Sequence, residues 1–222
     1  MLKTDIIICT MNRLHLLKQT INHIVDRTET PYRLHVMDNN SDRMVSDYLV
    51  GLLYAGILSS VFLSNERRGR MANRNMATWL AFSDPFVLVD DDILCPKLKP
   101  DWLSQGLDAM RQRSELGILA LNHPDALRRD YDEDEKVIYC EVVGNTFMFV
   151  KRAIVQGWNR PHFAGNYGVT DEMQRCSHAH DLGHRVGYLK DVCCYHTGQI
   201  NADGGPSTGP FKTPKNWETL EI

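Results

Sequence analysis

Short apolar runs alternate with amphipathic segments between residues 2 and 89, and this alternation constrains the fold more strongly than any other feature of the chain. The apolar runs are β-rich, and the segments between them repeat apolar residues at helical spacing. Crossovers between parallel strands are right-handed and place helices on both faces of the sheet. We therefore expect an α/β fold with a mostly parallel central sheet. The predicted strands are 2–9, 33–37, 60–63 and 86–89, and the predicted helices cover 14–25, 45–53 and 71–82.

The second half of the chain predicts a less regular set of elements, which ends in a tail rich in glycine and proline. We interpret residues 1–196 as one domain and 197–222 as an irregular C-terminal tail. The predictions are a helix over 99–113, a strand over 117–121, a loop over 122–136 ending in an acidic run, a strand pair of 137–143 and 145–150 around Gly144, a helix over 171–182, and strands over 186–189 and 192–195.

Composition is ordinary for a globular domain of 222 residues, with 43% hydrophobic and 24% charged residues. The net charge of -3 provides no overall basic field, so it does not indicate a nucleic-acid or anionic-membrane partner. The six cysteines lack the paired spacing of a disulfide framework, which favours a reducing, cytoplasmic location. The longest apolar stretch, 48–63, is shorter than the ~20 residues of a spanning helix, so no transmembrane segment is expected.

Three consecutive carboxylates follow the fourth predicted strand in the run "FVLVDDDILCP" at 86–96. Side chains alternate in extended backbone, so Asp90 and Asp92 can share one side while Asp91 points to the other. Their mutual repulsion is relieved if a hard cation such as Mg2+ or Mn2+ lies between them. The alternative is that one of them caps a helical turn and the others are solvated. The loops "TMNR" and "DNNSD" also follow predicted strands, so all three loops are expected at one rim of the sheet, where open parallel sheets bind ligands.

The stretches "TMNR", "MDNNSD", "NERRGRMANRN" and "LVDDD", in this order, resemble the nucleotide-sugar glycosyltransferases of family two, which have the GT-A (nucleotide-diphospho-sugar transferase) fold. The later stretches "GNTFMFVKR" and "DEMQRCSHAHDLGHRV" resemble the acceptor-side segments of the same family. The likeness runs from about residue 5 to residue 196. It implies a nucleotide-binding half over about 1–95 and an acceptor half over 96–196.

The resemblance assigns roles to residues of this chain. It implies metal ligands at the DXD-type motif and late in the domain, namely Asp90, Asp92 and His196, with Asp91 in reach. Asp38 would read the base, although it could instead only start a turn, and Arg74 with Asn75 would face the nucleotide. Arg67, Arg68 and Arg70 are interpreted as a solvated face. The nucleotide-sugar-binding candidates are Thr10, Asn12, Arg13, Asp38, Asn40, Gly69, Arg74, Asn75, Asp90, Asp91, Gly144 and Asn145.

The catalytic base is predicted at the start of the helix over 171–182, as Asp171 or Glu172. The family usually has Glu-Asp here and this chain has the reverse order, so both assignments stay open. Both could also be acidic residues that only stabilise a helix N-terminus. A zinc site from Cys176, His178, His180 and His184 is disfavoured, because Gly183 is expected to end the helix.

These patterns predict a glycosyltransferase that requires a divalent cation, Mn2+ or Mg2+, and moves a sugar from a nucleotide, with UDP favoured, to an acceptor hydroxyl. Inversion follows from the family. The lack of membrane spans and of a Gln-x-x-Arg-Trp run favours non-processive transfer. The acceptor stays open among glycans, lipid-linked sugars, proteins, metabolites and modified nucleic-acid bases. The reversed acidic pair leaves one alternative, a non-catalytic nucleotide-sugar-binding subunit or sensor.

Two other enzyme classes that place aspartates at strand ends fit less well. A haloacid-dehalogenase-type phosphohydrolase would have threonine two residues after Asp92, where this chain has Leu94. A sugar-nucleotide pyrophosphorylase would have an early glycine-rich loop, and "CTMNRLH" contains no glycine.

Overall fold

The computed structural model describes residues 3–122, 130–144, 146–155, 158 and 171–197. The predicted tail over 197–222 lies outside these residues, apart from Thr197. The strands are β1 (Thr4–Thr10), β2 (Tyr32–Asp38), β3 (Ser60–Leu63), β4 (Phe86–Asp90), β5 (Ile93–Leu94), β6 (Leu116–Asn122), β7 (Asp130–Glu133), β8 (Val137–Cys140), β9 (Phe147–Val150), β10 (Arg185–Cys193) and β11 (Tyr195–His196). The helices are α1 (Leu14–Arg27), α2 (Arg43–Tyr54), α3 (Arg70–Ala77), the short 3-10 helix Thr78–Leu80, α4 (Trp102–Gln112), α5 (Arg152–Val155) and α6 (Asp171–Asp181).

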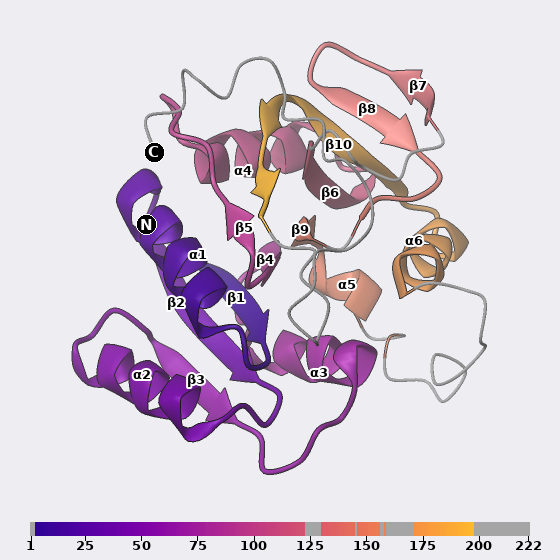
Figure 1. Ribbon diagram of the computed structural model, residues 1–222. Coiled ribbons are helices and arrows are strands. Elements are labelled where there is room, and N and C mark those ends of the chain that lie inside the picture. The colour runs from indigo at the N-terminus through magenta and orange to yellow at the C-terminus, as the bar shows by residue number, and fades with distance from the viewer. Residues whose placement is uncertain (1–2, 123–129, 145, 156–157, 159–170, 198–222) are drawn as a thin grey trace.

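A nine-stranded sheet forms the centre of the described part of the chain, in the order β3-β2-β1-β4-β9-β6-β10-β8-β7. The first four strands in this order are parallel, as the sequence predicted. Strand β9 then enters between β4 and β6 and is antiparallel to both. Figure 1 shows α2 and β3 at one end of the molecule and the β7–β8 hairpin at the opposite end. The parallel half is therefore the part that presents strand ends to a common rim.

Helices pack on both faces of the sheet, and each face has its own apolar core. On one face Ile6 and Ile8 of β1 pack with residues of α1, α2 and α4. On the other face Ile7 packs with residues of α3, α5 and α6. Alternate side chains of β1 thus pack into two different cores. Both faces of the strand are buried, which is why its sequence is an uninterrupted apolar run.

The strand register brings the predicted loops together at one rim. In the parallel pairing of β1, Thr10 lies opposite Asp38 of β2, and Cys9 lies opposite Asp90 of β4. Asn39 also donates its backbone N–H to the Thr10 carbonyl at 3.0 Å. The shared rim that the sequence predicted is confirmed.

Two predictions for the second half are wrong. The segments 137–143 and 145–150 do not pair with each other, because β8 lies between β7 and β10 whereas β9 lies between β4 and β6. The acidic run is an edge strand rather than a loop. Its charge is offset by basic side chains of β10, since Arg185 contacts Asp132 at 2.6 Å and Lys190 contacts Glu133 at 3.1 Å.

Other boundaries also differ from the sequence prediction. The helix over 71–82 ends as an α-helix at Ala77 and continues as one 3-10 turn. The predicted strands over 186–189 and 192–195 are one strand, β10, followed by the separate β11. A register shift against β6 between Leu189 and Cys193 explains the apparent interruption. No helix within the described ranges is both long and apolar enough to cross a bilayer.

Asp5 anchors the start of β1 and is fully buried. It accepts hydrogen bonds from Arg33 Nε at 2.6 Å, from His35 Nε2 at 3.0 Å, and from the backbone amides of Phe82 and Ser83 at 2.5 and 2.7 Å. Burial alone would raise the pKa of Asp5, but the hydrogen bonds from Arg33 and His35 outweigh it and lower the pKa to about 2.

This lowered pKa predicts an acid-dependent loss of stability. The contribution of the Asp5 charge is fully present above the unfolded-state pKa near 4 and is lost as the pH falls through about 2. At neutral pH it amounts to roughly 2 kcal/mol of unfolding free energy. We expect Asp5→Asn to be less stable than wild type at pH 7 and the gap to close near pH 2 in urea titrations. A gap that is constant with pH would contradict this role.

Gly106 lies in the middle of α4, where alanine would ordinarily stabilise a helix. A methyl group at Gly106 would overlap the ring of Phe149, which is fully buried and packs against Trp102 with ring centroids 6.0 Å apart. We expect Gly106→Ala to destabilise the fold by about 1–3 kcal/mol. Gly51→Ala in α2 is the matched control, because nothing lies within 4 Å of a methyl group there. Chemical denaturation should show it stabilised by up to ~1 kcal/mol, and equal effects of both changes would contradict the packing argument.

Candidate active site

The three carboxylates lie at the last residue of β4 and directly after it, in a largely buried position. The side chains of Asp91 and Asp92 are 0% and 1% exposed, and that of Asp90 is 15% exposed. Isolated buried charges are costly, so such a cluster requires compensating cations and hydrogen bonds. The structure shows that two arginines and one histidine provide them.

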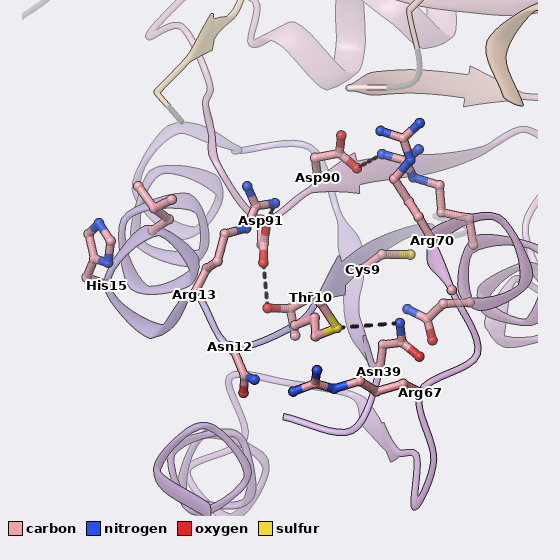
Figure 2. Close-up of a pocket in the computed structure, with 15 residues that line it drawn as sticks. Cys9, Thr10, Asn12, Arg13, His15, Asn39, Arg67, Arg70, Asp90 and Asp91 are labelled. Carbon is pink, nitrogen blue, oxygen red and sulfur yellow. Dashed lines mark hydrogen bonds and ion pairs between the residues drawn. The ribbon is translucent and has the colours of Figure 1, made fainter. Parts of the chain in front are cut away.

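Arg13 contacts two of the three carboxylates. It sits on the turn after β1, and its guanidinium donates to Asp92 Oδ2 at 2.6 Å through Nη1 and to Asp91 Oδ1 through Nη2. Thr10 also donates its hydroxyl to Asp91 Oδ2 at 2.6 Å. Figure 2 shows the contact between Thr10 and Asp91 as a dashed line, with the Arg13 side chain reaching Asp91 from the turn before α1. Burial raises the pKa of Asp91 to about 6, although the Arg13 charge opposes this shift.

Arg74 contacts the remaining carboxylate. It lies on α3, is buried, and donates from Nη2 to Asp90 Oδ1. Gly69, the residue directly before α3, has φ 76°, a backbone conformation that glycine adopts without strain. The turn at Gly69 therefore sets the direction of the helix that carries Arg74 to the strand ends.

His196 reaches the same cluster from the far end of the domain. Antiparallel pairing of β11 with β5 places His196 opposite Ile93, and its Nε2 lies 3.2 Å from Asp92 Oδ2. Thr197 reinforces this position, since its N–H and hydroxyl both donate to the Asp92 carbonyl, at 2.8 and 3.0 Å. Burial opposes charging of His196, but the hydrogen bond and charge of Asp92 outweigh burial and raise its pKa.

A cavity of about 830 Å³ opens beside this cluster. Its size falls in the range of small-ligand sites, roughly 300–1,000 Å³. The predicted residues that line it are Thr10, Asn12, Arg13, Gly69, Arg74, Asp90 and Asp91, and further lining comes from Cys9, Met11, His15, Leu16, Asn39, Arg67, Arg70 and Asn73. Arg67 and Arg70, which the sequence suggested were only solvated, thus border the cavity. Their position depends on the loop before α3, which local sequence does not specify.

Asp38 forms the turn that was one of its two predicted roles, and its reading of the base stays a prediction. Its Oδ2 accepts the Ser41 N–H at 3.0 Å, which forms the turn after β2. Its Oδ1 is buried and has no hydrogen-bond partner, so one acceptor is left for a ligand donor. Asn40 follows in the left-handed conformation with φ 61°. A hydrogen bond joins the loop after β2 to the loop after β1, since Asp42 donates its N–H to Asn12 Oδ1 at 2.6 Å.

Asn75 and Gly144, which were also predicted at the site, do not line the cavity. Asn75 donates to the Trp158 carbonyl at 2.8 Å and accepts from Arg175 at 3.1 Å, so its side chain joins α3 to α6. Gly144 donates its N–H to the Tyr188 hydroxyl at 2.6 Å. Asn145 lies outside the described residues.

Helix α6 begins at Asp171, as the sequence predicted. Glu172 is half-buried in its first turn, and the side chain of Asp171 is not among those described. Arg175, one turn further along, is buried. Its guanidinium carbon lies 4.6 Å from the centroid of the Trp158 ring, and its Nη2 donates to Asn75 Oδ1. Sequence reasoning did not single out Arg175, since an arginine in a polar helix carries no signal that it is buried.

The cysteine and histidine cluster of α6 bonds to backbone groups. Cys176 Sγ accepts the Val143 N–H at 3.4 Å, and His180 lies 3.1 Å from the carbonyls of both His184 and Glu141. Gly183 ends the helix in a left-handed conformation with φ 79°. These contacts account for Cys176 and His180 as residues that bond α6 to the neighbouring backbone.

Comparison with known proteins then identifies the family. Residues 5–171 match the family described as Glycosyl transferase family 2. The chain belongs to this family. No match was found among curated proteins.

Solved structures show that this family-2 domain has the GT-A fold. Mannosyltransferase PcManGT from Pyrobaculum calidifontis, in complex with GDP-Man and Mn2+, aligns with a TM-score of 0.66 and 15% identity over 90% of this chain and 58% of its own. S. aureus TarS 1-349 in complex with UDP-GlcNAc gives 0.65 and 15% over 87% and 58%. GalNAc-T7 with UDP, GalNAc and Mn2+ gives 0.71 and 13% over 94% and 46%. The chain thus spans about half of the length of these proteins.

We call the three carboxylates and the histidine the aspartate corner (Asp90, Asp91, Asp92 and His196). Its ligand atoms are of the types that bind a hard divalent cation. Carboxylate oxygens and an imidazole suit Mn2+ or Mg2+. Asp92 Oδ1 is buried without a hydrogen-bond partner, so the corner retains an open acceptor. Within the described ranges no three His, Cys, Asp or Glu side chains already converge as a ligand set. The two arginines engage the carboxylates instead.

Proposed function

We propose that this family-2 domain is a metal-dependent, inverting, non-processive glycosyltransferase that moves a sugar from a nucleoside diphosphate, with UDP favoured, to an acceptor hydroxyl. The observation that carries the proposal is the aspartate corner, which holds buried carboxylates and an unsatisfied acceptor beside a ligand-sized cavity. PcManGT is in complex with GDP-Man and Mn2+, and GalNAc-T7 with UDP, GalNAc and Mn2+, which supports the same ligand classes here.

Two features support a position for the donor nucleotide at the rim of the parallel strands. The rim of the parallel strands, where Thr10 lies opposite Asp38 and Cys9 lies opposite Asp90, is where open α/β sheets bind ligands. The unpartnered Asp38 Oδ1 would accept the imide N–H of uracil. A buried acceptor that gains a donor on binding gives selectivity, because a base without that donor leaves the acceptor unsatisfied. Residues 1–95 would thus form the nucleotide half and 96–196 the acceptor half.

The chemistry of transfer assigns tasks to the chain's own residues. Asp90, Asp92 and His196 would hold a divalent cation, which when bound supplies Lewis-acid stabilisation of the diphosphate charge. An acid at the start of α6, Asp171 or Glu172, would take the proton of the acceptor hydroxyl as it attacks the anomeric carbon. Arg175 ties α6 to α3 through Asn75 and so fixes the helix that carries the base. A single displacement of this kind inverts the anomeric centre.

The test is a panel of sugar nucleotides with Mn2+ or Mg2+, read by thermal shift and by release of the nucleoside diphosphate. A donor that binds the folded state raises the melting temperature. We expect at least one UDP-sugar to raise it only with the cation present and to be slowly hydrolysed. Tight binding without turnover would favour the alternative of a nucleotide-sugar sensor, and NMR of a product with retained configuration would contradict inversion.

A further inference from the structure

Arg13 supplies a positive charge to two carboxylates of the aspartate corner. It bridges two almost fully buried carboxylates, with 2.6 Å from Nη1 to Asp92 Oδ2 and a second contact from Nη2 to Asp91 Oδ1. Such a bidentate arrangement satisfies one oxygen of each carboxylate with a single positive charge. Asp92 Oδ1 still lacks a partner. Arg13 therefore leaves one carboxylate oxygen unsatisfied, and a further positively charged ligand could bind it.

The backbone around Arg13 differs from that of the other arginine at the corner. Arg13 lies outside α1, at φ −115° and ψ 52°, directly after Asn12 in the left-handed conformation with φ 58°. Its side chain is 34% exposed and borders the cavity, whereas Arg74 is 5% exposed and fixed on α3. Figure 2 shows the Arg13 side chain reaching from its turn toward Asp91. Because this side chain is partly exposed and borders the cavity, its guanidinium has room to turn away from the carboxylates.

We propose that Arg13 is an exchange residue: it neutralises Asp91 and Asp92 before ligands arrive, and it moves to the donor diphosphate when a divalent cation takes its place. This inference rests on the proposed function and deepens it, because it assigns Arg13 to the diphosphate of the donor.

Charge balance gives the physical reason for the exchange. A cation that arrives alone must displace Arg13 and leaves two positive groups close together, which disfavours binding. A cation that arrives with a diphosphate offers the displaced guanidinium a new anionic partner of suitable bidentate shape. Cation and nucleotide should therefore bind with positive coupling, each raising the affinity for the other by the same factor.

The variant Arg13→Gln tests this by calorimetry with Mn2+ alone and with UDP at saturating Mn2+, and GDP is run in parallel. Without the competing charge, we expect Mn2+ alone to bind at least about tenfold more tightly than to wild type. UDP at saturating Mn2+ should bind about tenfold more weakly, because a charge-assisted contact to phosphate is lost. Mn2+ alone should also raise the melting temperature of Arg13→Gln more than that of wild type.

Two further variants separate the exchange from general charge effects. Arg67→Gln removes one charge from the lining of the same cavity, and we expect its affinity for Mn2+ alone to stay within about threefold of wild type. Arg13→Lys keeps the charge, so Mn2+ alone should bind it nearly as weakly as wild type. Because Mn2+ itself stabilises the corner, Arg13→Gln can be measured in the metal-bound state even if it is less stable without metal.

The outcomes are distinct. Unchanged Mn2+ affinity in Arg13→Gln, or a lysine variant that behaves like glutamine, would overturn the neutralising role. UDP affinity unchanged at saturating Mn2+ would overturn the movement to the diphosphate and leave Arg13 as a static ion pair. If wild type binds neither UDP nor GDP with Mn2+, the proposed function itself fails, and the exchange fails with it.

Discussion

Asp92→Asn is expected to lower the rate of sugar transfer by at least about 100-fold, because the amide removes the charge that would hold the cation beside the donor diphosphate. Asn keeps the shape of Asp, so the hydrogen bonds to Arg13 and His196 are altered less than the charge is. The measurements are kcat/KM with the preferred donor and the affinity for Mn2+ in the presence of UDP. Both should fall together.

Asp47→Asn is the matched control, since Asp47 is an exposed residue of α2 that pairs with Arg43 at 3.3 Å. We expect its transfer rate and Mn2+ affinity to match those of wild type. If Asp92→Asn folds, with an unchanged circular-dichroism spectrum, and transfers sugar at the wild-type rate, a metal-binding role for the aspartate corner is ruled out.

One of the two acids at the start of α6 is expected to lose about 10²- to 10⁴-fold in kcat when it is replaced by its amide. The variants are Asp171→Asn and Glu172→Gln. A general base acts on the acceptor and not on donor binding, so the affinity for UDP with Mn2+ should stay near that of wild type. Single-turnover kinetics with donor and acceptor separate these two effects.

Asp181→Asn, at the exposed end of the same helix, controls for loss of an acid from α6. We expect it to transfer sugar normally. Normal transfer by both Asp171→Asn and Glu172→Gln would remove the base from this helix. A fall in donor affinity without a fall in kcat would instead show that the acid binds the donor.

Local pattern was sufficient for much of the parallel half of the fold. The predicted strand 60–63 matches β3, and 86–89 matches β4 apart from Asp90. Apolar runs buried on both faces and helices with one apolar stripe are signals carried within a few neighbouring residues. The rim could be predicted as well, because the ends of parallel strands must lie at one edge of the sheet.

Sequence-distant contacts could not be predicted in the same way. Nothing in the local sequence separates β9 from β8, because both are short apolar runs on either side of Gly144. Their partners depend on which strands lie free at the centre and edge of the sheet once the rest has assembled. The missed positions of Arg67 and Arg70 at the cavity have the same origin.

Local pattern placed three carboxylates at the end of a buried strand, within a series of strands and helices. The groups that neutralise them are brought there by the tertiary fold. Arg13 lies 79 residues from Asp92 along the chain, and His196, whose Nε2 lies 3.2 Å from Asp92 Oδ2, comes from the opposite end of the domain. Side-chain periodicity acts over a few residues, whereas the choice of an ion-pair partner depends on the register of β1 with β4 and of β5 with β11. That register is fixed by packing of the whole domain.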